Sequence, residues 1–442
     1  MRKRKVIALY LGLAMLIGFF AGCDRPAANV TEPINDTKEV KGKKEDMFLA
    51  EGLNQEYISG QKEFAFRLFQ KMKDDENIFL SPYSISTALS MLYNGADGNT
   101  RKEMAELFGY QFLPGYSEEN TSEGNQQMNA YNKLLIDTLR DADPKVKIDI
   151  ANSIWMAKDE QLADSIEDAL LAPVRNYYNG DIFQVDFTNE EVLKQVNHWV
   201  SDQTDGMINP FLQQFASPDD LRLLLVNAIY FNGKWSKPFS PDDTYHTTFY
   251  GLNADTQVEE MCLYEQEYRY YADNGIQGLE IPYGNGELVM DVLIPLDKEQ
   301  ATIGEAFDQL KTEDINELLQ KLDKAYPVMI SKIGLPKFEM EYGSVELRDI
   351  LMDLGMKEAF DDNRADFSPI GDNLVLTSVI HKAKIEVEEW GTRASAATGL
   401  TVETTAALVT DPLEFVVDVP FIFFIRDKAT DTILFMGQMN HM

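Results

Sequence analysis

Basic side chains are scarce in this chain. It carries 40 Lys and Arg against 73 Asp and Glu, a formal net charge of −33 over 442 residues. Beyond residue 5 we find no run of Lys and Arg on a plausible helix face, so the surface repels nucleic acid, anionic lipid head groups and sulfated polysaccharides. We therefore expect no nucleic-acid partner, and we interpret the acidic exterior as a means of solubility.

Cysteine and histidine are also rare. The chain has two cysteines, and if Cys23 is modified as described below, Cys262 has no partner for an internal disulfide. The fold must then rest on its core, for which 44% hydrophobic residues suffice.

Neither a Gly-x-Ser-x-Gly elbow nor a phosphate loop occurs, and the histidines lack metal-site spacing, so we expect no metal, no cofactor and no hydrolytic enzyme. The four histidines are His198, His246, His381 and His441.

The first 22 residues predict an export signal. Four basic residues (2–5) precede an apolar run (6–20) that is short for a membrane span. Ala21-Gly22-Cys23 then resembles the lipobox of bacterial lipoproteins, in which the cysteine is acylated and becomes the first mature residue. Phe20 stands where an aliphatic residue is usual, and an ordinary secretory signal is the alternative. We expect an exported protein, lipid-anchored through Cys23 to the cell envelope or cell surface, or released extracellularly.

The remainder divides into a tether and a folded region. Residues 23–50 are polar and aperiodic, which predicts a flexible tether. From residue 51 to 442, apolar helical periodicity at 64–72 is followed by strand-like runs, among them 146–155, 223–231, 278–295 and 415–436. Ser81-Pro82 predicts a helix start, with Ser81 as the N-cap. The sequence therefore predicts an α+β fold with extensive sheet.

One segment near the C-terminus has the pattern of a strand but little bulk. From residue 392 onward, Thr392, Ala394, Ala396 and Thr398 alternate with Arg393, Ser395, Ala397 and Gly399. One face suits a core and the other suits water, yet such small side chains hold a strand only weakly in a sheet. Composition alone favours a simple linker.

Six ordered motifs resemble those of the serpin family, and the resemblance spans essentially residues 50–442. They are 77–84 (Asn-Ile-Phe-Leu-Ser-Pro-Tyr-Ser), 227–235 (Asn-Ala-Ile-Tyr-Phe-Asn-Gly-Lys-Trp), 335–338 (Leu-Pro-Lys-Phe), 365–368 (Ala-Asp-Phe-Ser), 381–383 (His-Lys-Ala) and 420–426 (Pro-Phe-Ile-Phe-Phe-Ile-Arg). Each alone is weak, but the ordered set is specific.

The resemblance implies a single domain of three β-sheets with eight or nine helices and an exposed reactive-centre loop, here about residues 389–412. It also implies suicide inhibition of serine proteases, or of cysteine proteases as a second class. The protease forms an acyl-enzyme at a loop bond, and the cut loop enters the large sheet as a new strand before water resolves the ester. Non-inhibitory members of the family exist, so the alternative is a non-inhibitory binding lipoprotein on the same fold.

The small residues of the alternating segment suit such insertion. The resemblance assigns the hinge to this segment, and the inward side chains are small enough to enter a sheet quickly, where a charge or a proline would obstruct it. Arg393 replaces an acidic residue common in the family but falls on the solvent face, and Trp390 is an unusual neighbour that leaves open how fast the hinge moves. The hinge residues are Glu389, Gly391, Thr392, Ala394, Ala396 and Thr398.

Two further groups of residues are assigned by resemblance. Between residues 379 and 389, Lys382, Lys384, Glu386 and Glu388 alternate with an apolar face that includes His381. A lone histidine on such a face is more often a satisfied core residue than a catalyst. The resemblance places it with Ser81, Ser84 and Asn227 in the shutter beneath the middle of the large sheet, and places Trp235 and Glu389 in the breach, where insertion begins.

Two counts locate the cleaved bond differently. With the spacing that the family resemblance implies, counting from Gly391 gives Thr405-Ala406, whereas counting back from Pro420 gives a bond near Val409-Thr410, because this loop is about four residues longer than is common in the family. The window 404–410 therefore stays open, and it contains no Arg or Lys, so the target has a shallow apolar pocket like that of elastase-like or subtilisin-like proteases; Leu408 also admits a chymotrypsin-like pocket. We expect a monomer that forms a covalent acyl complex with its target. The candidate residues are Thr405, Ala406, Ala407, Leu408 and Val409.

Overall fold

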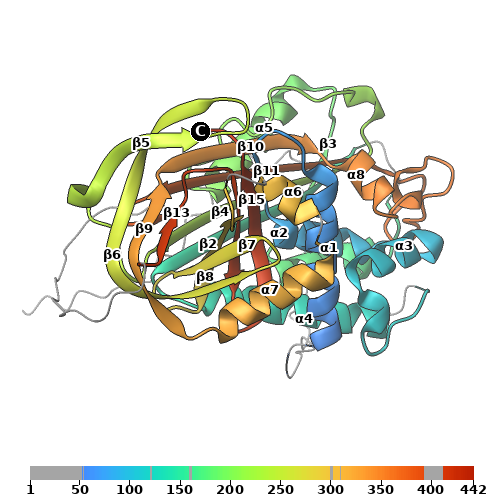
Figure 1. The fold of residues 1–442 in the computed structure, drawn as a ribbon. Helices are drawn as coiled ribbons and strands as arrows, with labels where there is room; N and C mark the ends of the chain where they lie inside the picture. Colours follow the sequence, from blue (N-terminus) through green and yellow to red (C-terminus); the bar gives the residue numbers. More distant parts are fainter. Residues whose placement is uncertain are drawn as a thin grey trace, which may run out of the picture. The chain divides into compact units, whose positions relative to one another are not determined.

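Two β-sheets and their covering helices make up the part of the chain that the computed structural model describes (Figure 1). All described residues belong to one unit, residues 39–442. The predicted α+β fold class is confirmed. The structure describes residue 52 and residues 54–119, 122–158, 162–298, 302–308, 310–392 and 412–442.

The first sheet has six strands and contains the segments predicted to open. Their order is β10, β11, β12, β4, β2, β3. The strand predicted at 223–231 extends to Lys234, and residues 379–388, where charged side chains alternate with an apolar face, lie in one strand that begins at Leu376. The bounds are β2 (Val146–Ala157), β3 (Asp181–Val185), β4 (Leu223–Lys234), β10 (Phe338–Glu346), β11 (Leu376–Glu388) and β12 (Gly391–Thr392).

The second sheet has nine strands among the described residues, ordered β1, β15, β14, β8, β7, β6, β9, β13, with β5 paired to β6. The family resemblance implied three sheets in all. Here the 19-residue β6 pairs with β5 and β9 along its first part and with β7 near its end, so hydrogen bonding joins two groups of strands into one sheet. The bounds are β1 (Ile78–Leu80), β5 (Thr244–Tyr250), β6 (Asp255–Asp273), β7 (Ile276–Pro282), β8 (Leu288–Pro295), β9 (Pro327–Pro336), β13 (Glu414–Val416), β14 (Phe421–Asp427) and β15 (Thr432–Met439).

Several helices begin where the sequence supplies a capping side chain. Ser81 caps α2, because its hydroxyl accepts a hydrogen bond from Ser84 N at 3.1 Å and proline occupies the first turn. Asn54 caps α1 in the same way. The helices are α1 (Gln55–Met72), α2 (Pro82–Tyr93), α3 (Gly98–Phe108), α4 (Ser122–Asp141), α5 (Glu190–Gln203), α6 (Ile303–Asp308), α7 (Thr312–Lys324) and α8 (Arg348–Asp353). Short 3₁₀ and π turns include η1 (Tyr110–Phe112), Glu167–Leu171 and Val174–Tyr178.

The six-stranded sheet has a different core on each face. Alternate side chains of β4 point to opposite sides: Leu223, Leu225 and Ile229 join the main core with α1 and α2, while Leu224, Val226 and Ala228 join a smaller core under α5. Both faces are therefore covered. A strand added to this sheet must bring side chains that fit a buried face.

Candidate functional site

The two residues of β12 lie between β11 and β4 at one end of the six-stranded sheet. Thr392 is opposite Val387 of β11 and Gly233 of β4. Gly391 has φ of +147°, and a Cβ at this position would lie 2.1 Å from the carbonyl oxygen of Gly233. Only glycine therefore permits this entry into the sheet.

Beyond β12 the sheet is closed. β4 and β11 pair directly and in parallel, from Leu223 opposite Leu376 to Tyr230 opposite Lys384. The strands part only where β12 separates them. Two residues of the predicted hinge, Gly391 and Thr392, thus form a short strand between β4 and β11.

An aromatic pair supports the inward side chain of the hinge. Thr392 is fully buried, and its hydroxyl lies 2.8 Å from that of Tyr283. Tyr283 stacks on Trp235 with ring centroids 4.4 Å apart. The indole of Trp235 donates to the carbonyl of Glu388 at 2.9 Å, and its backbone N–H donates to the carbonyl of Trp390 at 3.1 Å. These contacts fix the position where the loop leaves β11.

Glu389, which the family resemblance assigns to the breach together with Trp235, directly follows the residue whose carbonyl accepts from the Trp235 indole. It is 8% exposed, its carboxylate accepts from Thr244 Oγ1 at 3.1 Å, and Lys337 Nζ lies 3.2 Å away. Burial alone would raise the pKa of Glu389, but hydrogen bonds from its own backbone and from Lys337 lower it on balance. The carboxylate is charged at neutral pH and anchors the start of the loop.

The residues predicted for the shutter also meet, beneath the middle of the sheet. His381 Nδ1 is 2.5 Å from Asn227 Oδ1, and its Nε2 lies 3.2 Å from the backbone nitrogen of Ser81. The Asn227 amide donates to Ser84 Oγ and to Asn152 Oδ1, both at 2.5 Å. All five residues are at most 5% exposed.

The hydrogen bonds of His381 define its charge state. Nε2 accepts from a backbone N–H and so carries no proton, while Nδ1 donates to the Asn227 oxygen. Burial lowers the pKa of His381 to about 3, so the ring is neutral. The shutter is a network of neutral hydrogen bonds across the β4–β11 pair, where His381 and Asn227 are in register.

Sequence reasoning missed three contributors to these sites. Tyr283 and Asn152 were not assigned, and Lys337 was seen only as part of a motif. A polar Asn152 inside a strand that is otherwise largely apolar was the one available signal. Tyr283 lies 109 positions from Thr392, and nothing local marks it as a partner.

Several predicted residues fall outside the described part of the chain. They are Cys23 and the loop residues Ala394, Ala396, Thr398, Thr405, Ala406, Ala407, Leu408 and Val409. The described chain resumes at Pro412, and Leu413 is fixed at once, because its carbonyl accepts from Ser331 N at 2.8 Å and from Ser331 Oγ at 2.9 Å. The described residues that flank this part of the loop, Thr392 and Leu413, are therefore both held by hydrogen bonds.

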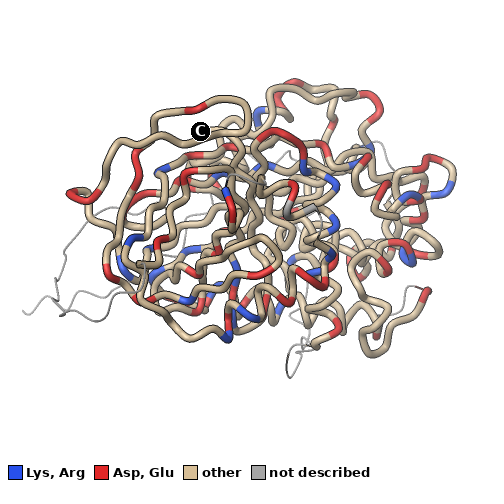
Figure 2. The backbone as a smooth tube through the Cα atoms, in the orientation of Figure 1, with Lys and Arg blue, Asp and Glu red and all other residues tan. Residues whose placement is uncertain are grey.

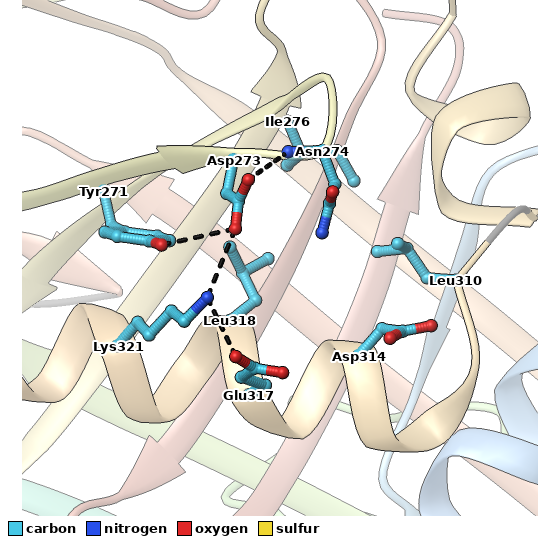
Figure 3. A pocket seen from close by; sticks show the side chains of 9 residues that line it. All are labelled: Tyr271, Asp273, Asn274, Ile276, Leu310, Asp314, Glu317, Leu318 and Lys321. Atoms are coloured by element: carbon cyan, nitrogen blue, oxygen red, sulfur yellow. Dashed lines mark hydrogen bonds and ion pairs between the residues drawn. The ribbon is translucent and has the colours of Figure 1, made fainter.

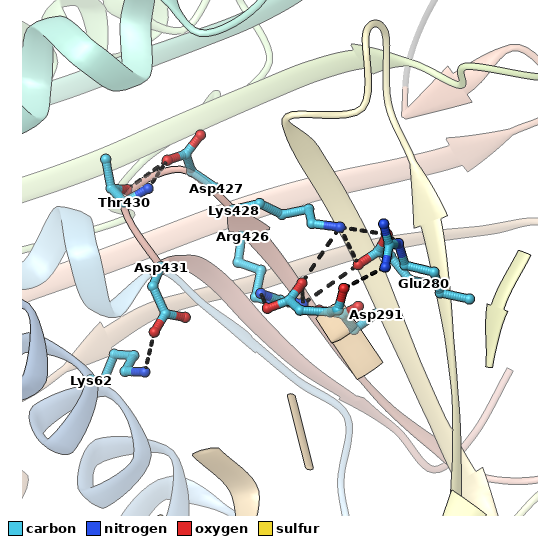
Figure 4. Close-up of polar contacts among 10 residues, drawn as sticks. Lys62, Glu280, Asp291, Arg426, Asp427, Lys428, Thr430 and Asp431 are labelled. Atoms are coloured by element: carbon cyan, nitrogen blue, oxygen red, sulfur yellow. Dashed lines mark hydrogen bonds and ion pairs between the residues drawn. The ribbon is translucent and has the colours of Figure 1, made fainter. Parts of the chain in front are cut away.

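A buried ion cluster lies in the nine-stranded sheet (Figure 4). Arg426 is fully buried and donates through both terminal nitrogens to the carboxylate of Asp323 at 2.8 Å, and through Nε to Asp291. Lys428 Nζ contacts both oxygens of Glu280 at 2.8 Å. Asp291, Asp323 and Glu280 each have a cation partner, so the cluster links β14 to β8, β7 and α7.

Other surface features offer little chemistry. A cleft between the β6–β7 turn and α7 (Figure 3) holds only about 20 Å³, and Lys321 crosses it to Asp273 at 3.2 Å and Glu317 at 2.9 Å. A second cleft of about 520 Å³ lies beside Pro210 and Lys382.

Within the described ranges, no three His, Cys, Asp or Glu side chains gather as a metal site. The same ranges contain no helix with the length and apolarity to cross a bilayer.

Comparisons with known proteins agree with the resemblance seen in the sequence motifs. Residues 59–442 match the family model described as "Serpin (serine protease inhibitor)". An uncharacterized serpin-like protein of Thermococcus kodakarensis is 32% identical, covering 97% of each chain. Leukocyte elastase inhibitor A of Mus musculus is 33% identical, covering 85% of this chain and 97% of its own length.

Solved structures agree with these relatives. The native state of the thermophilic serpin tengpin superimposes with a TM-score of 0.78 at 28% identity, covering 90% of this chain and 98% of tengpin. Human thyroxine-binding globulin complexed with thyroxine superimposes with a TM-score of 0.72 at 26% identity, covering 87% of this chain and 98% of the globulin. The similar proteins thus include both a leukocyte elastase inhibitor and a thyroxine-binding globulin.

Proposed function

Since this chain belongs to the serpin family, we propose that it is a suicide inhibitor of serine proteases, with elastase-like or subtilisin-like enzymes as targets and cysteine proteases as a second class. It acts without catalysis of its own. The protease cuts the loop that follows β12, and the cut loop inserts between β4 and β11. The observation that carries this proposal is β12 itself, two residues already seated between those strands.

The register of β12 assigns the partners of an inserted loop. If the strand continues from Thr392 without a bulge, Ala394 comes between Ile385 and Phe231, and Ala396 between Ala383 and Ile229. All four of these neighbours are buried in the main core. Small side chains are required there, because a larger one would force the covering helices away from the sheet.

The same register brings Thr398 to the shutter. Thr398 falls between His381 and Asn227, whose direct hydrogen bond must break when the strands part. A hydroxyl can both donate and accept, so Thr398 can restore a partner to each side chain. The one polar inward residue among Ala394, Ala396 and Thr398 thus meets the polar site.

The length of the sheet favours one of the two candidate bonds. β4 begins at Leu223, which the register places opposite residue 402, so residues 392–402 fill the available slot. Thr405 follows three positions later, whereas Val409 follows seven positions later. A shorter segment between residue 402 and the acyl bond leaves less slack, so the protease is pressed harder against the end of the sheet. We propose Thr405-Ala406 as the cleaved bond.

The chemistry of trapping needs only the protease's own groups. Its serine oxygen attacks the Thr405 carbonyl carbon, the C–N bond to Ala406 breaks, and the Ala406 nitrogen leaves as an amine with the serine's proton. The ester remains until water attacks. About a dozen new ladder hydrogen bonds at roughly 0.5 to 1.5 kcal/mol each supply on the order of 10 kcal/mol to deform the protease before that happens.

We also propose, from the sequence, that the protein is exported and anchored by a lipid. The basic and apolar segments of residues 1–22 support export, and Cys23 in its lipobox-like setting supports lipid anchoring to the cell envelope or cell surface. The tether 23–50 then holds a monomeric inhibitor clear of the membrane. Retention of the protein in a detergent phase, and its loss from that phase in Cys23→Ser, would test the anchor.

A second candidate function is non-inhibitory binding. It is favoured by the similarity to thyroxine-binding globulin, a structure solved with thyroxine. Incubation with leukocyte elastase and with subtilisin separates the two. An inhibitor yields a complex with the protease that survives SDS and heat, whereas a binding protein is left intact or is cleaved without a complex.

A further inference from the structure

We propose that Thr377 fastens the end of the β4–β11 joint that lies away from β12, and that breaking its hydrogen bonds is the last step of loop insertion. This inference rests on the proposed function and adds to it a positioning residue. We call the Thr377 hydroxyl, together with its backbone partners in Arg222 and Leu223, the Thr377 clamp.

The clamp joins one side chain to three backbone groups. Thr377 Oγ1 accepts from the backbone nitrogens of Arg222 at 2.8 Å and Leu223 at 3.1 Å, and it donates to the carbonyl of Leu223 at 3.0 Å. A hydroxyl has one proton and two lone pairs, so its hydrogen-bonding capacity is fully used. Leu223 is fully buried, so its backbone groups need partners in the closed sheet.

A shift in register accounts for the use of a side chain here. β4 and β11 pair in parallel, with Leu376 opposite Leu223 and Ser378 opposite Leu224. Thr377 is therefore an extra residue on β11, and such a bulge interrupts the regular ladder. The contact between the two strands thus depends on a single side chain at the point where β4 begins.

β11 is also bound to β10 at this level. The Glu346 carboxylate of β10 accepts from Val379 N at 3.0 Å and from the Ser378 hydroxyl. Leu347 N donates to the Val379 carbonyl at 2.9 Å. β10 and β11 therefore move as one pair when a strand enters, and the clamp is the contact that parts.

The register of β12 brings the end of the inserted segment to the clamp. Thr392 lies opposite Val387 of β11 and Gly233 of β4. Ten residues further along, an inserted strand without a bulge places Val402 between the two sides of the clamp. The backbone of that strand then offers β4 the partners that the Thr377 hydroxyl gives up. The clamp must open before these new bonds form, so it opposes insertion at the last residue of the slot.

This position links the clamp to the fate of the acyl-enzyme. Thr405 follows residue 402 by three positions, so the protease reaches the end of the sheet only after the clamp has opened. Until then water can still resolve the ester, because the protease is not yet deformed. The clamp therefore limits the rate at which trapping is completed.

The test follows the protease to this end of the sheet. Leukocyte elastase carries one dye, and the chain carries a second at Asp372→Cys, an exposed position just before β11, so energy transfer rises as the protease arrives. The background is Cys23→Ser, and Cys262 stays unlabelled because it is buried. The delay between release of the fragment that begins at Ala406 and the rise in energy transfer measures insertion alone.

Elastase is used at saturating concentration. Acidic side chains are spread over the whole described chain (Figure 2), so the rate of encounter with a charged protease depends on ionic strength. Saturation removes the encounter from the measurement.

Two variants without the hydroxyl should speed arrival. In Thr377→Val, which keeps the β-branched shape, the rate constant of arrival after cleavage should rise about fivefold, because the closed sheet loses hydrogen bonds that insertion would otherwise break. Thr377→Ala should show the same rise although its side chain is smaller. Thr377→Ser keeps the hydroxyl and should retain the wild-type rate.

Thr100→Val is the matched control. Thr100 is fully buried, and its hydroxyl accepts from the backbone nitrogen of Asp366 at 2.9 Å. The substitution removes a comparable hydrogen bond outside the β4–β11 joint. It should destabilise the chain and leave the arrival rate unchanged.

The outcomes separate the two proposals. Wild-type arrival rates in both Thr377→Val and Thr377→Ala, with normal covalent complexes, would overturn the clamp and leave the inhibitory function standing. Equal acceleration in Thr377→Ser or in Thr100→Val would also overturn the clamp, because the effect would then not come from this hydroxyl. Absence of any covalent complex from the unsubstituted chain, with leukocyte elastase and with subtilisin, would overturn the function and the clamp with it.

Discussion

The hydroxyl of Thr392 lies 2.8 Å from the hydroxyl of Tyr283, and both side chains are fully buried. This contact joins the first inward residue of the hinge to β7 and β8 through the Tyr283 turn, and Tyr283 in turn stacks on Trp235. The uncleaved chain therefore already holds the loop's first inward side chain inside the protein. In the proposed mechanism, the residues after Thr392 follow it into the sheet once the loop is cut.

Replacement of the buried threonine tests this arrangement. Thr392→Arg would place a guanidinium where the side chain is 0% exposed, and an unpaired buried charge is costly. We expect insertion to stall, so that the protease hydrolyses the ester and the variant becomes a substrate. The stoichiometry of inhibition is the measurement, with Thr392→Ser as the control. Full inhibitory stoichiometry in Thr392→Arg would refute the insertion account.

Gly391→Ala addresses the entry of the hinge into the sheet. The new methyl group would collide with the Gly233 carbonyl, and the backbone cannot relax at φ of +147°. We expect β12 to leave the sheet, seen as faster hydrogen exchange of residues 391 and 392 before any cleavage. Gly304→Ala is the control, because its Cβ would meet only ordinary contact. Unchanged exchange in Gly391→Ala would show that β12 does not depend on glycine.

His381 should make stability depend on pH. Its pKa is about 3 when buried in the fold and about 6.5 in the unfolded chain. The unfolded state therefore binds more protons between these values, and stability falls as pH drops below about 6.5. Between pH 7.5 and pH 5 this contribution is about 2 kcal/mol.

The check is denaturant unfolding of wild type and His381→Gln at both pH values. The variant should lose about 2 kcal/mol of the pH dependence, whatever its absolute stability. His198→Gln, at an exposed site, should keep the dependence of the wild type. An equal pH dependence in wild type and His381→Gln would mean that the histidine is not held neutral.

The buried ion cluster predicts a large effect from a single carboxylate. Asp291→Ala leaves the fully buried Arg426 without the partner of its Nε, which typically costs about 3 to 5 kcal/mol. Urea unfolding at pH 7.5 measures this. Asp353→Ala is the control, because its ion pair with Lys71 is largely exposed and should change stability by no more than about 0.5 kcal/mol. A similar small loss in Asp291→Ala would show that Asp323 alone satisfies Arg426.

The sequence predicted those features that depend on local pattern. Period-two alternation between residues 379 and 389 assigned His381 to an apolar face, which is buried in the structure, and Ser81-Pro82 marked the start of α2. The family motifs then brought Ser84 and Asn227 to the shutter. These signals lie within a few residues of what they predict.

Features that depend on contacts distant in sequence could not be predicted. Tyr283 reaches Thr392 across 109 positions, and Asp323 reaches Arg426 across 103. Because many tyrosines and acids in this chain are ordinary surface or core residues, composition does not select these two.

The central claim is that cleavage of the loop traps the protease. Mass spectrometry of the denatured mixture with leukocyte elastase tests it most directly. The account predicts a covalent adduct of the protease with the chain ending at Thr405, together with a free fragment that begins at Ala406. A cleaved chain with no adduct, or an intact chain beside active protease, would contradict it.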